Sequence, residues 1–219
     1  MHVHLPKPLH GWRAFAGEVG IIVLGVLIAL VAQQLVSAIQ SRADADRLRR
    51  ALGSELADDR ARFDLMRSQD ACAQKRLADL DYWLATAPPS AHVDDGYGLE
   101  IFNMHSSAWD IAKGDSAIAQ IPLDERLAYA SLYSTIDNWR GVLGDEKSNG
   151  EQLTELLATA DDPQNRRQIR LRLLSAHNLL NNRIKNYGFL FSRLDKLRIK
   201  SDMAGVPYKI DANAMCQPL

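Results

Sequence analysis

Residues 14–38 read AFAGEVGIIVLGVLIALVAQQLVSA, and residues 19–32 within this stretch carry no polar side chain. A helix needs about 20 mostly apolar residues to cross the hydrocarbon core of a bilayer. The pattern therefore predicts a transmembrane helix over residues 14–38, with the lipid bilayer as a partner. The polar residues of the stretch all lie near its ends, where a membrane helix meets the headgroups: Glu18, Gln33, Gln34 and Ser37.

Three other structures compete for this segment. A cleaved signal peptide needs a small-residue cleavage pattern, which is unconvincing here, and the helical pattern runs on through residues 33–36 without a turn signal. A peripheral amphipathic helix is apolar on one face, whereas this segment is apolar all round. A buried core helix is the third alternative.

Helix-breaking residues are scarce after the apolar segment, because between residues 26 and 87 the only glycine or proline is Gly53. We therefore expect the membrane helix to continue into a long stalk helix that ends near Ala87. Asp59 and Asp70 interrupt its apolar stripe, which favours one helix of a bundle over a coiled coil. The stripe repeats at spacings of three, four or seven residues: Leu48, Leu52, Leu56, Phe63, Met66, Ala73, Leu77, Leu80 and Leu84.

Breaker and capping residues divide the rest of the chain into further helices. Asp162 and Pro163 form a helix start, with Asp as N-cap and Pro in the first turn, and the helix is expected to run to about Lys200. Before it we expect a helix over 99–112, a middle helix from Pro122 to about Gly144, a turn at 148–150 and a helix over 151–160. The predicted inner face of the middle helix is Leu123, Leu127, Ala130, Tyr133, Ile136, Arg140 and Leu143.

The fold class that follows is all-α: an N-terminal transmembrane helix continues into a long stalk helix that packs in a helical bundle. The predicted parts are an N-terminal tail, the transmembrane helix, a helical bundle domain and a C-terminal tail, at residues 1–13, 14–38, 39–200 and 201–219.

Charge and motifs exclude several functions. The 219 residues hold 26 Lys and Arg against 27 Asp and Glu, and nucleic-acid binding needs a clustered basic face, so no nucleic acid is expected. The chain shows no nucleophile elbow, phosphate-binding glycine loop or metal-ligand spacing, so we assign no catalytic, cofactor-binding or metal-binding residue. Adjacent carboxylates such as Asp58 and Asp59 point in different directions on a helix and are interpreted as solvated charges.

The two cysteines, Cys72 and Cys216, lack the spacing of a zinc or redox motif. A disulfide between them would tie the C-terminal tail to the bundle and stabilise the fold by about 5 kcal/mol at most. Disulfides persist outside the cytoplasm, so this pairing favours a periplasmic domain. Two unrelated free thiols are the alternative.

The orientation of the span has arguments on both sides. Lys7 and Arg13 precede the span, whereas four arginines follow it closely, and this count favours a cytoplasmic domain. Long domains, however, translocate largely regardless of such charges. Because of the cysteines we expect a single-pass protein of the bacterial inner membrane with its C-terminal domain in the periplasm. The four arginines are Arg42, Arg47, Arg49 and Arg50.

One face of the predicted span is a candidate helix–helix interface. Gly25 and Ala29 form a small-xxx-small pair, and Glu18 and Gln33 are polar groups near the ends of the span. Such a face allows close approach and hydrogen bonds between helices. We expect a homo-oligomer or a membrane-protein partner, although small residues are also common in membrane helices generally.

Two tryptophans are candidates for a ligand pocket. Trp109 precedes Asp110, and Trp139 lies between Asn138 and Arg140. Aromatic rings beside polar groups are typical of ligand sites. Packing in the bundle core, with the indole N–H satisfied, is the alternative.

The N-terminal sequence resembles that of a known group of proteins. PKPLHGWR at residues 6–13 and GEVGIIVLGVLIAL at residues 17–30 resemble a set of proteobacterial proteins that have a single membrane span and no known function. The resemblance implies membrane attachment and carries no activity or cofactor. We therefore predict a membrane-anchored helical protein without catalytic activity, acting as a scaffold, accessory subunit or assembly protein. A ligand-sensing periplasmic bundle and a membrane-bound enzyme of unrecognised type are the alternatives.

Overall fold

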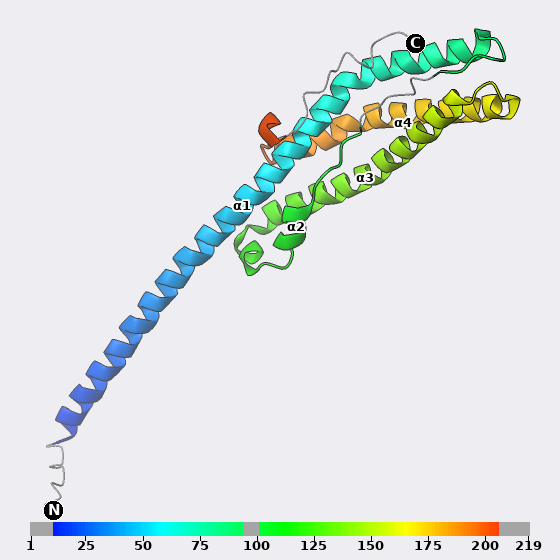
Figure 1. Ribbon diagram of the computed structural model, residues 1–219. Coiled ribbons are helices and arrows are strands. Elements are labelled where there is room, and N and C mark those ends of the chain that lie inside the picture. The colour runs from blue at the N-terminus through cyan, green and yellow to red at the C-terminus, as the bar shows by residue number, and fades with distance from the viewer. Residues whose placement is uncertain (1–10, 94–100, 206–219) are drawn as a thin grey trace, which may run out of the picture. The chain divides into compact units, whose positions relative to one another are not determined.

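The computed structural model describes residues 11–93 and 101–205, and within these ranges every regular element is a helix. The all-α prediction is confirmed. The chain divides into two units after Arg47: the first contains the start of the first helix, and the second contains the bundle. The elements (Figure 1) are α1 (Trp12–Thr86), α2 (Ser107–Ala112), the 3₁₀ turn η1 (Ser116–Gln120), α3 (Leu123–Ala158), α4 (Pro163–Lys196) and η2 (Met203–Gly205).

In the first unit, α1 covers the whole predicted membrane segment without a break. Its most apolar stretch has a mean hydropathy of 2.5 over 18 residues, and none of that stretch is buried. A core helix of a soluble protein would bury these side chains, so this alternative is not favoured. A membrane span and a signal sequence both fit an apolar helix near the N-terminus.

In the second unit, α1 and α3 run parallel. Arg49 Nε donates to Glu125 Oε1 at 2.9 Å, and further along both helices Tyr133 Oη donates to Glu55 Oε1 at 2.9 Å. Parallel neighbours cannot be joined by a short turn, so the chain between them must return along the bundle.

Helix α4 runs antiparallel to α1. Arg60 near the start of the bundle pairs with Asp195 at 2.5 Å, and Asp81 near the end of α1 pairs with His177 at 2.8 Å. Helices α1, α3 and α4 therefore lie side by side in the second unit (Figure 1).

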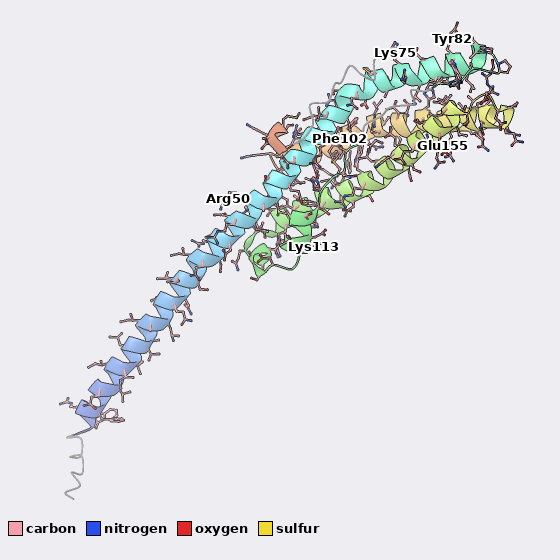
Figure 2. All side chains as sticks on the ribbon, viewed as in Figure 1. Arg50, Lys75, Tyr82, Phe102, Lys113 and Glu155 are labelled. Atoms are coloured by element: carbon pink, nitrogen blue, oxygen red, sulfur yellow. The ribbon has the colours of Figure 1, made fainter. Side chains whose placement is uncertain are left out.

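The predicted stripe of α1 forms one side of the core. Charged side chains such as Lys75 and Glu155 point away from this core (Figure 2). The helical spacing of apolar residues thus identified the buried face of α1 correctly. Leu84 is half-buried against the core, and the other eight predicted residues are buried: Leu48, Leu52, Leu56, Phe63, Met66, Ala73, Leu77 and Leu80.

Helix α3 is continuous, so the turn predicted at residues 148–150 is wrong. Asn149 is buried, and its side-chain amide donates to the carbonyl of Arg172 in α4 at 3.1 Å. Ser-Asn-Gly favours a turn in isolation, but packing against α4 overrides this local preference.

The predicted inner face of α3 is also partly wrong. Leu123 and Leu127 are exposed, whereas Tyr129, Leu132 and Trp139 are buried beside the correctly predicted members of the face. The error arises because α3 packs between two partners, so the position of its buried face depends on tertiary contacts and not on apolar spacing alone.

The returning connector contains a segment, residues 101–121, that we call the strap. Its helix α2 begins at Ser107, and residues 101–106 are not helical, so the helix predicted from residue 99 is too long; residues 94–100 lie outside the described ranges. The backbone N–H of His105 donates to Asp59 and that of Ala108 to Glu55. In a longer helix, these two N–H groups would donate to backbone carbonyl groups of the preceding turn. Here the carboxylates of α1 accept them instead.

Both ends of α4 have local caps. The predicted N-cap is confirmed, because Asp162 Oδ1 accepts the N–H of Gln164 at 2.8 Å. At the other end Arg198 takes a φ of 57°, and the N–H of Ile199 donates to the carbonyl of Leu194 at 3.0 Å. This is the Schellman pattern, which ends a helix by satisfying its last carbonyl groups.

Candidate functional site between helices α3 and α4

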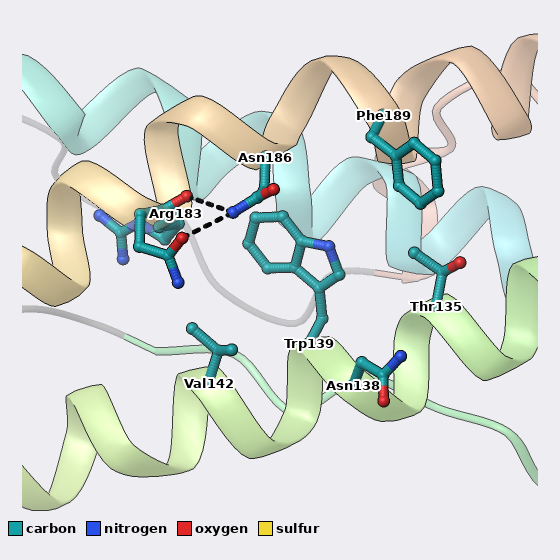
Figure 3. Close-up of a pocket in the computed structure, with 8 residues that line it drawn as sticks. Thr135, Asn138, Trp139, Val142, Arg183, Asn186 and Phe189 are labelled. Carbon is teal, nitrogen blue, oxygen red and sulfur yellow. Dashed lines mark hydrogen bonds between the residues drawn. The ribbon is translucent and has the colours of Figure 1, made fainter.

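A pocket with a volume of about 220 Å³ opens between α3 and α4 (Figure 3). On each helix, the spacing of the lining residues places them on one face. The faces of the two antiparallel helices meet at the pocket. We call it the α3–α4 pocket. Helix α3 contributes Thr135, Asn138, Trp139 and Val142, and helix α4 contributes Asn182, Arg183, Asn186 and Phe189.

Trp139 forms the inner wall of the α3–α4 pocket. Only 6% of the residue is exposed. Its ring stacks on Tyr187 at 5.3 Å between centroids and meets the edge of Phe63 at 5.2 Å, which fixes the indole in place. The indole nitrogen lies on the edge that faces Thr135 and Phe189 (Figure 3). Within the described ranges its N–H has no hydrogen-bond acceptor, although a buried tryptophan usually finds one.

Asparagine side chains supply the polar wall. Asn186 Nδ2 donates to the carbonyl of Asn182 at 2.7 Å and to Asn182 Oδ1 at 2.8 Å (Figure 3). The Asn182 amide is therefore oriented, and its own NH₂ group is left as a donor. Asn138 is exposed on the α3 side, with both its donor and acceptor groups available to a bound molecule.

Phe189 supplies the second aromatic surface. The residue is 55% exposed, and the Arg193 guanidinium lies 4.3 Å from the centroid of its ring. Arg193 also donates a hydrogen bond to the Ser131 hydroxyl of α3. One face of the ring is thus covered by a cation, while the ring remains part of the pocket wall.

Arg183 connects the pocket to a buried ion network. Its side chain is 0% exposed; Nη1 donates to Glu146 Oε2 at 3.0 Å and Nη2 to Asp70 Oδ1 at 2.7 Å. Because Asp70 comes from α1 and Glu146 from α3, the network joins all three long helices. Several polar atoms here lack a partner among the described residues, namely Glu146 Oε1, Arg183 Nε and Tyr187 Oη.

Burial has the largest single effect on the pKa values of the groups in this network. It raises the pKa of Asp70 and of Glu146, and the Arg183 guanidinium opposes the rise in both. For Arg183, burial acts to lower the pKa, but the neighbouring Glu146 carboxylate and the other groups of the network raise it above its usual value. The arginine therefore stays charged, and the two carboxylates depend on it.

A second buried cluster holds the strap. Asp59 is fully buried, and its two oxygens accept the backbone N–H of His105 at 3.0 and 3.2 Å. Glu55 accepts the N–H of Ala108 and the Tyr133 hydroxyl, both at 2.9 Å. The interpretation of Asp58 and Asp59 as solvated charges is therefore wrong for Asp59, whose partner lies 46 positions away along the chain.

The environment of Asp59 is unfavourable for its charged form. Burial raises its pKa to about 7, while the His105 N–H and the Arg62 guanidinium oppose the rise. Arg62 donates to the carbonyl of Asn103 at 2.6 Å and lies against the His105 ring. Burial and Arg62 lower the pKa of His105.

The two predicted pocket residues take different places. Trp139 lines the α3–α4 pocket, and its role in binding a ligand stays a prediction. Trp109 does not; it stacks on Tyr133 at 5.2 Å and holds α2 against α3. The main pocket residue that sequence reasoning missed is Phe189, an exposed aromatic residue near Asn182 and Asn186 of α4.

His105 and His177 do not form a common site. His105 Nδ1 lies 3.8 Å from Asp59, whereas His177 pairs with Asp81. Asp59 and Asp81 are 22 positions apart on one helix, or about 33 Å at the usual rise. Among the described residues, no group of three or more His, Cys, Asp or Glu is placed to hold a metal ion.

The predicted disulfide lies partly outside the described ranges. Cys72 is half-buried in α1 and is disulfide-bonded. The sequence has one other cysteine, Cys216, which lies outside the described residues. Its pairing with Cys72 stays a prediction.

The predicted membrane interface remains a prediction as well. Glu18, Gly25, Ala29 and Gln33 all lie exposed on the first part of α1. Nothing within the described part of this single chain packs against Gly25, where an added Cβ would meet no atom within 4 Å.

Comparison with protein-family models, with characterised proteins and with solved structures finds no match to this chain. The fold and the site thus define only a class: a helical-bundle protein whose first helix begins with a long, exposed apolar segment.

Proposed function

We propose that the protein is a membrane-anchored helical protein that assembles with itself or with another membrane protein, as a scaffold or accessory subunit and not as an enzyme. The observation that carries this proposal is the apolar start of α1, which has a mean hydropathy of 2.5 and no buried residue in its most apolar stretch. Exposing so much apolar surface to water is unfavourable, and lipid would remove that cost.

The proposed location is the bacterial inner membrane, with a single pass and a periplasmic bundle. The disulfide bond of Cys72 supports the periplasmic side, since disulfides are rare in the cytoplasm. The resemblance of residues 6–30 to single-span proteobacterial proteins supports the same attachment.

Charged residues placed in the apolar segment test the anchor. With Leu24→Arg and Leu27→Arg together, we expect the chain to leave the membrane fraction, because each arginine near the centre of a span costs about 2.5–3.5 kcal/mol. Extraction of membranes at alkaline pH separates integral from peripheral protein. Leu123→Arg with Leu127→Arg, at two exposed leucines of α3, is the control and should stay integral. A wild-type chain shortened by signal cleavage and released from the membrane would refute the anchor.

The outward face of α4 supports assembly. Leu171 and Leu174 are 57% and 60% exposed, and they share a shallow surface hollow with Ser175, Asn178 and Asn182. These residues recur every three or four positions and carry no charge. A contiguous uncharged face on a helix otherwise rich in charged residues is typical of a contact surface.

We expect Leu171→Glu with Leu174→Glu to weaken assembly of the full-length protein about tenfold or more, because two carboxylates would be buried at the contact. Cross-linking in cells and sedimentation in lipid nanodiscs measure the change. Leu123→Glu with Leu127→Glu is the matched control, since these leucines are 62% and 60% exposed on α3. Equal effects of the two pairs, or a wild-type protein that is monomeric and cross-links to nothing, would argue against assembly through this face.

A second candidate function is ligand sensing by the bundle. The α3–α4 pocket favours it, because a solid core would have left no room for a small molecule between these helices. Stacked rings and the Arg183 network fix the wall of the pocket. A bound ligand would therefore contact α3 and α4 directly, and α1 through Arg183, which bonds to Asp70.

A further inference from the structure

We propose that the α3–α4 pocket binds an uncharged small molecule of about one ring that carries a hydrogen-bond acceptor such as a carbonyl group. This inference rests on the ligand-sensing candidate and is independent of membrane attachment. It follows from the volume of the pocket, from its unused donors and from the state of Arg183, the one charged residue among the described residues that line it.

The volume limits the size of the ligand. A pocket of about 220 Å³ is larger than a cavity of about 150 Å³ that holds benzene, and smaller than the roughly 300–1,000 Å³ of sites for drug-sized ligands. One six-membered ring with a small substituent therefore fits. The Trp139 and Phe189 rings supply the flat apolar surfaces that such a ring prefers (Figure 3).

The unused donors define the polar end of the ligand. The Trp139 indole N–H can only donate, belongs to a residue that is 6% exposed, and has no acceptor within the described ranges; it is not one of the fully buried unpaired atoms. The Asn182 NH₂ group is a second donor, because the Asn186 bond occupies its oxygen and not its nitrogen. The two donors come from different walls of the pocket, and each can donate to an acceptor atom of a ligand, such as a carbonyl oxygen.

The charge of the wall excludes ions as the favoured ligands. Of the eight lining residues only Arg183 is ionised, and both of its terminal nitrogens are bound to Asp70 and Glu146. Among these eight residues an anion would find no unpaired cation and a cation would find no carboxylate, and Arg193, which is not a lining residue, covers the Phe189 ring and bonds to Ser131. Either ion would lose hydration without a counter-charge in return.

Three probes that share one ring test the inference: benzamide, benzoate and benzylammonium. They are titrated into the full-length protein in nanodiscs and followed by calorimetry and by the indole N–H resonances of the ¹⁵N-labelled tryptophans. We expect benzamide to shift the Trp139 resonance and to bind about tenfold or more tightly than either ion. Equal or tighter binding of an ion, or no shift of Trp139 at millimolar benzamide, would overturn the proposed ligand class.

Two variants test the contacts. Trp139→Phe keeps an aromatic ring but removes the donor, and we expect benzamide to bind about fivefold to tenfold more weakly. Trp109→Phe makes the same change outside the pocket and should leave binding unaltered. Because Trp139→Phe perturbs the core, Asn182→Leu serves as a second variant on an exposed residue, with the same expected loss.

Unchanged benzamide binding in both Trp139→Phe and Asn182→Leu would place the ligand elsewhere and refute the inference. Alkaline extraction of the same preparations separates this result from the anchor. If the protein binds benzamide but is released from the membrane, the ligand inference holds and the proposed anchor is refuted. If it stays in the membrane but does not bind benzamide, the anchor holds and the ligand inference is refuted.

Discussion

Arg183→Met is expected to lower the free energy of unfolding of the bundle by about 3–5 kcal/mol, the usual cost of removing one partner of a buried ion pair. The arginine is 0% exposed and bonds to Asp70 and Glu146. Methionine fills much of the same volume but leaves two carboxylates in the core without a cation. Urea unfolding in detergent micelles, followed by tryptophan fluorescence, measures the change.

Two further variants isolate the cause. Arg193→Met on the same helix removes an arginine whose hydrogen bond to Ser131 is exposed, and its effect should stay within about 1 kcal/mol. Adding Asp70→Asn and Glu146→Gln to Arg183→Met removes both unpaired charges and should recover part of the lost stability. If Arg183→Met and Arg193→Met cost the same, the network does not stabilise the bundle.

Asp59→Asn is expected to stabilise the protein at alkaline pH relative to wild type and to change its pH dependence. Burial raises the folded-state pKa of Asp59 from 3.8 to about 7. Because the folded-state pKa is raised, the protonated Asp59 contributes fully to the stability of the fold when the pH is below the unfolded-state pKa of the group. This contribution to stability is lost as the pH rises through about 7. A rise of the pKa from 3.8 to about 7 corresponds to about 4 kcal/mol, so the variant should gain on the order of that amount relative to wild type between pH 4 and pH 8.

The difference between the two proteins is the quantity to measure, because other groups also titrate. The pKa of His105 is lowered, so its contribution to the stability of the protein is lost as the pH falls. This change opposes the effect of Asp59. Asparagine keeps an oxygen that accepts the His105 N–H, so the strap anchor is retained. Asp58→Asn, at the neighbouring position, is the control and should show no comparable change with pH. A stability difference that stays constant across this range would show that Asp59 titrates normally.

The sequence by itself determined two of the three long helices, α1 and α4. In α1, Leu52, Leu56 and Leu80 are buried where the helical spacing predicts, and the Asp162 cap starts α4 where expected. These features are local: a helix buries whatever its own 3.6-residue period places on one side, and a cap bonds to its own first turn. The apolar character of residues 14–38 is likewise a property of consecutive residues and needs no partner to be recognised.

Only the tertiary structure decided which charges are buried and where the pocket lies. Asp70 interrupts an apolar stripe in the sequence, and its cation, Arg183, lies 113 positions away. Asp59 depends in the same way on the strap, and Trp139 faces Phe189 only because α3 and α4 pack antiparallel. Burial of a polar group is favourable only when a partner is in place, and such partners are set by packing between helices and not by spacing along one of them.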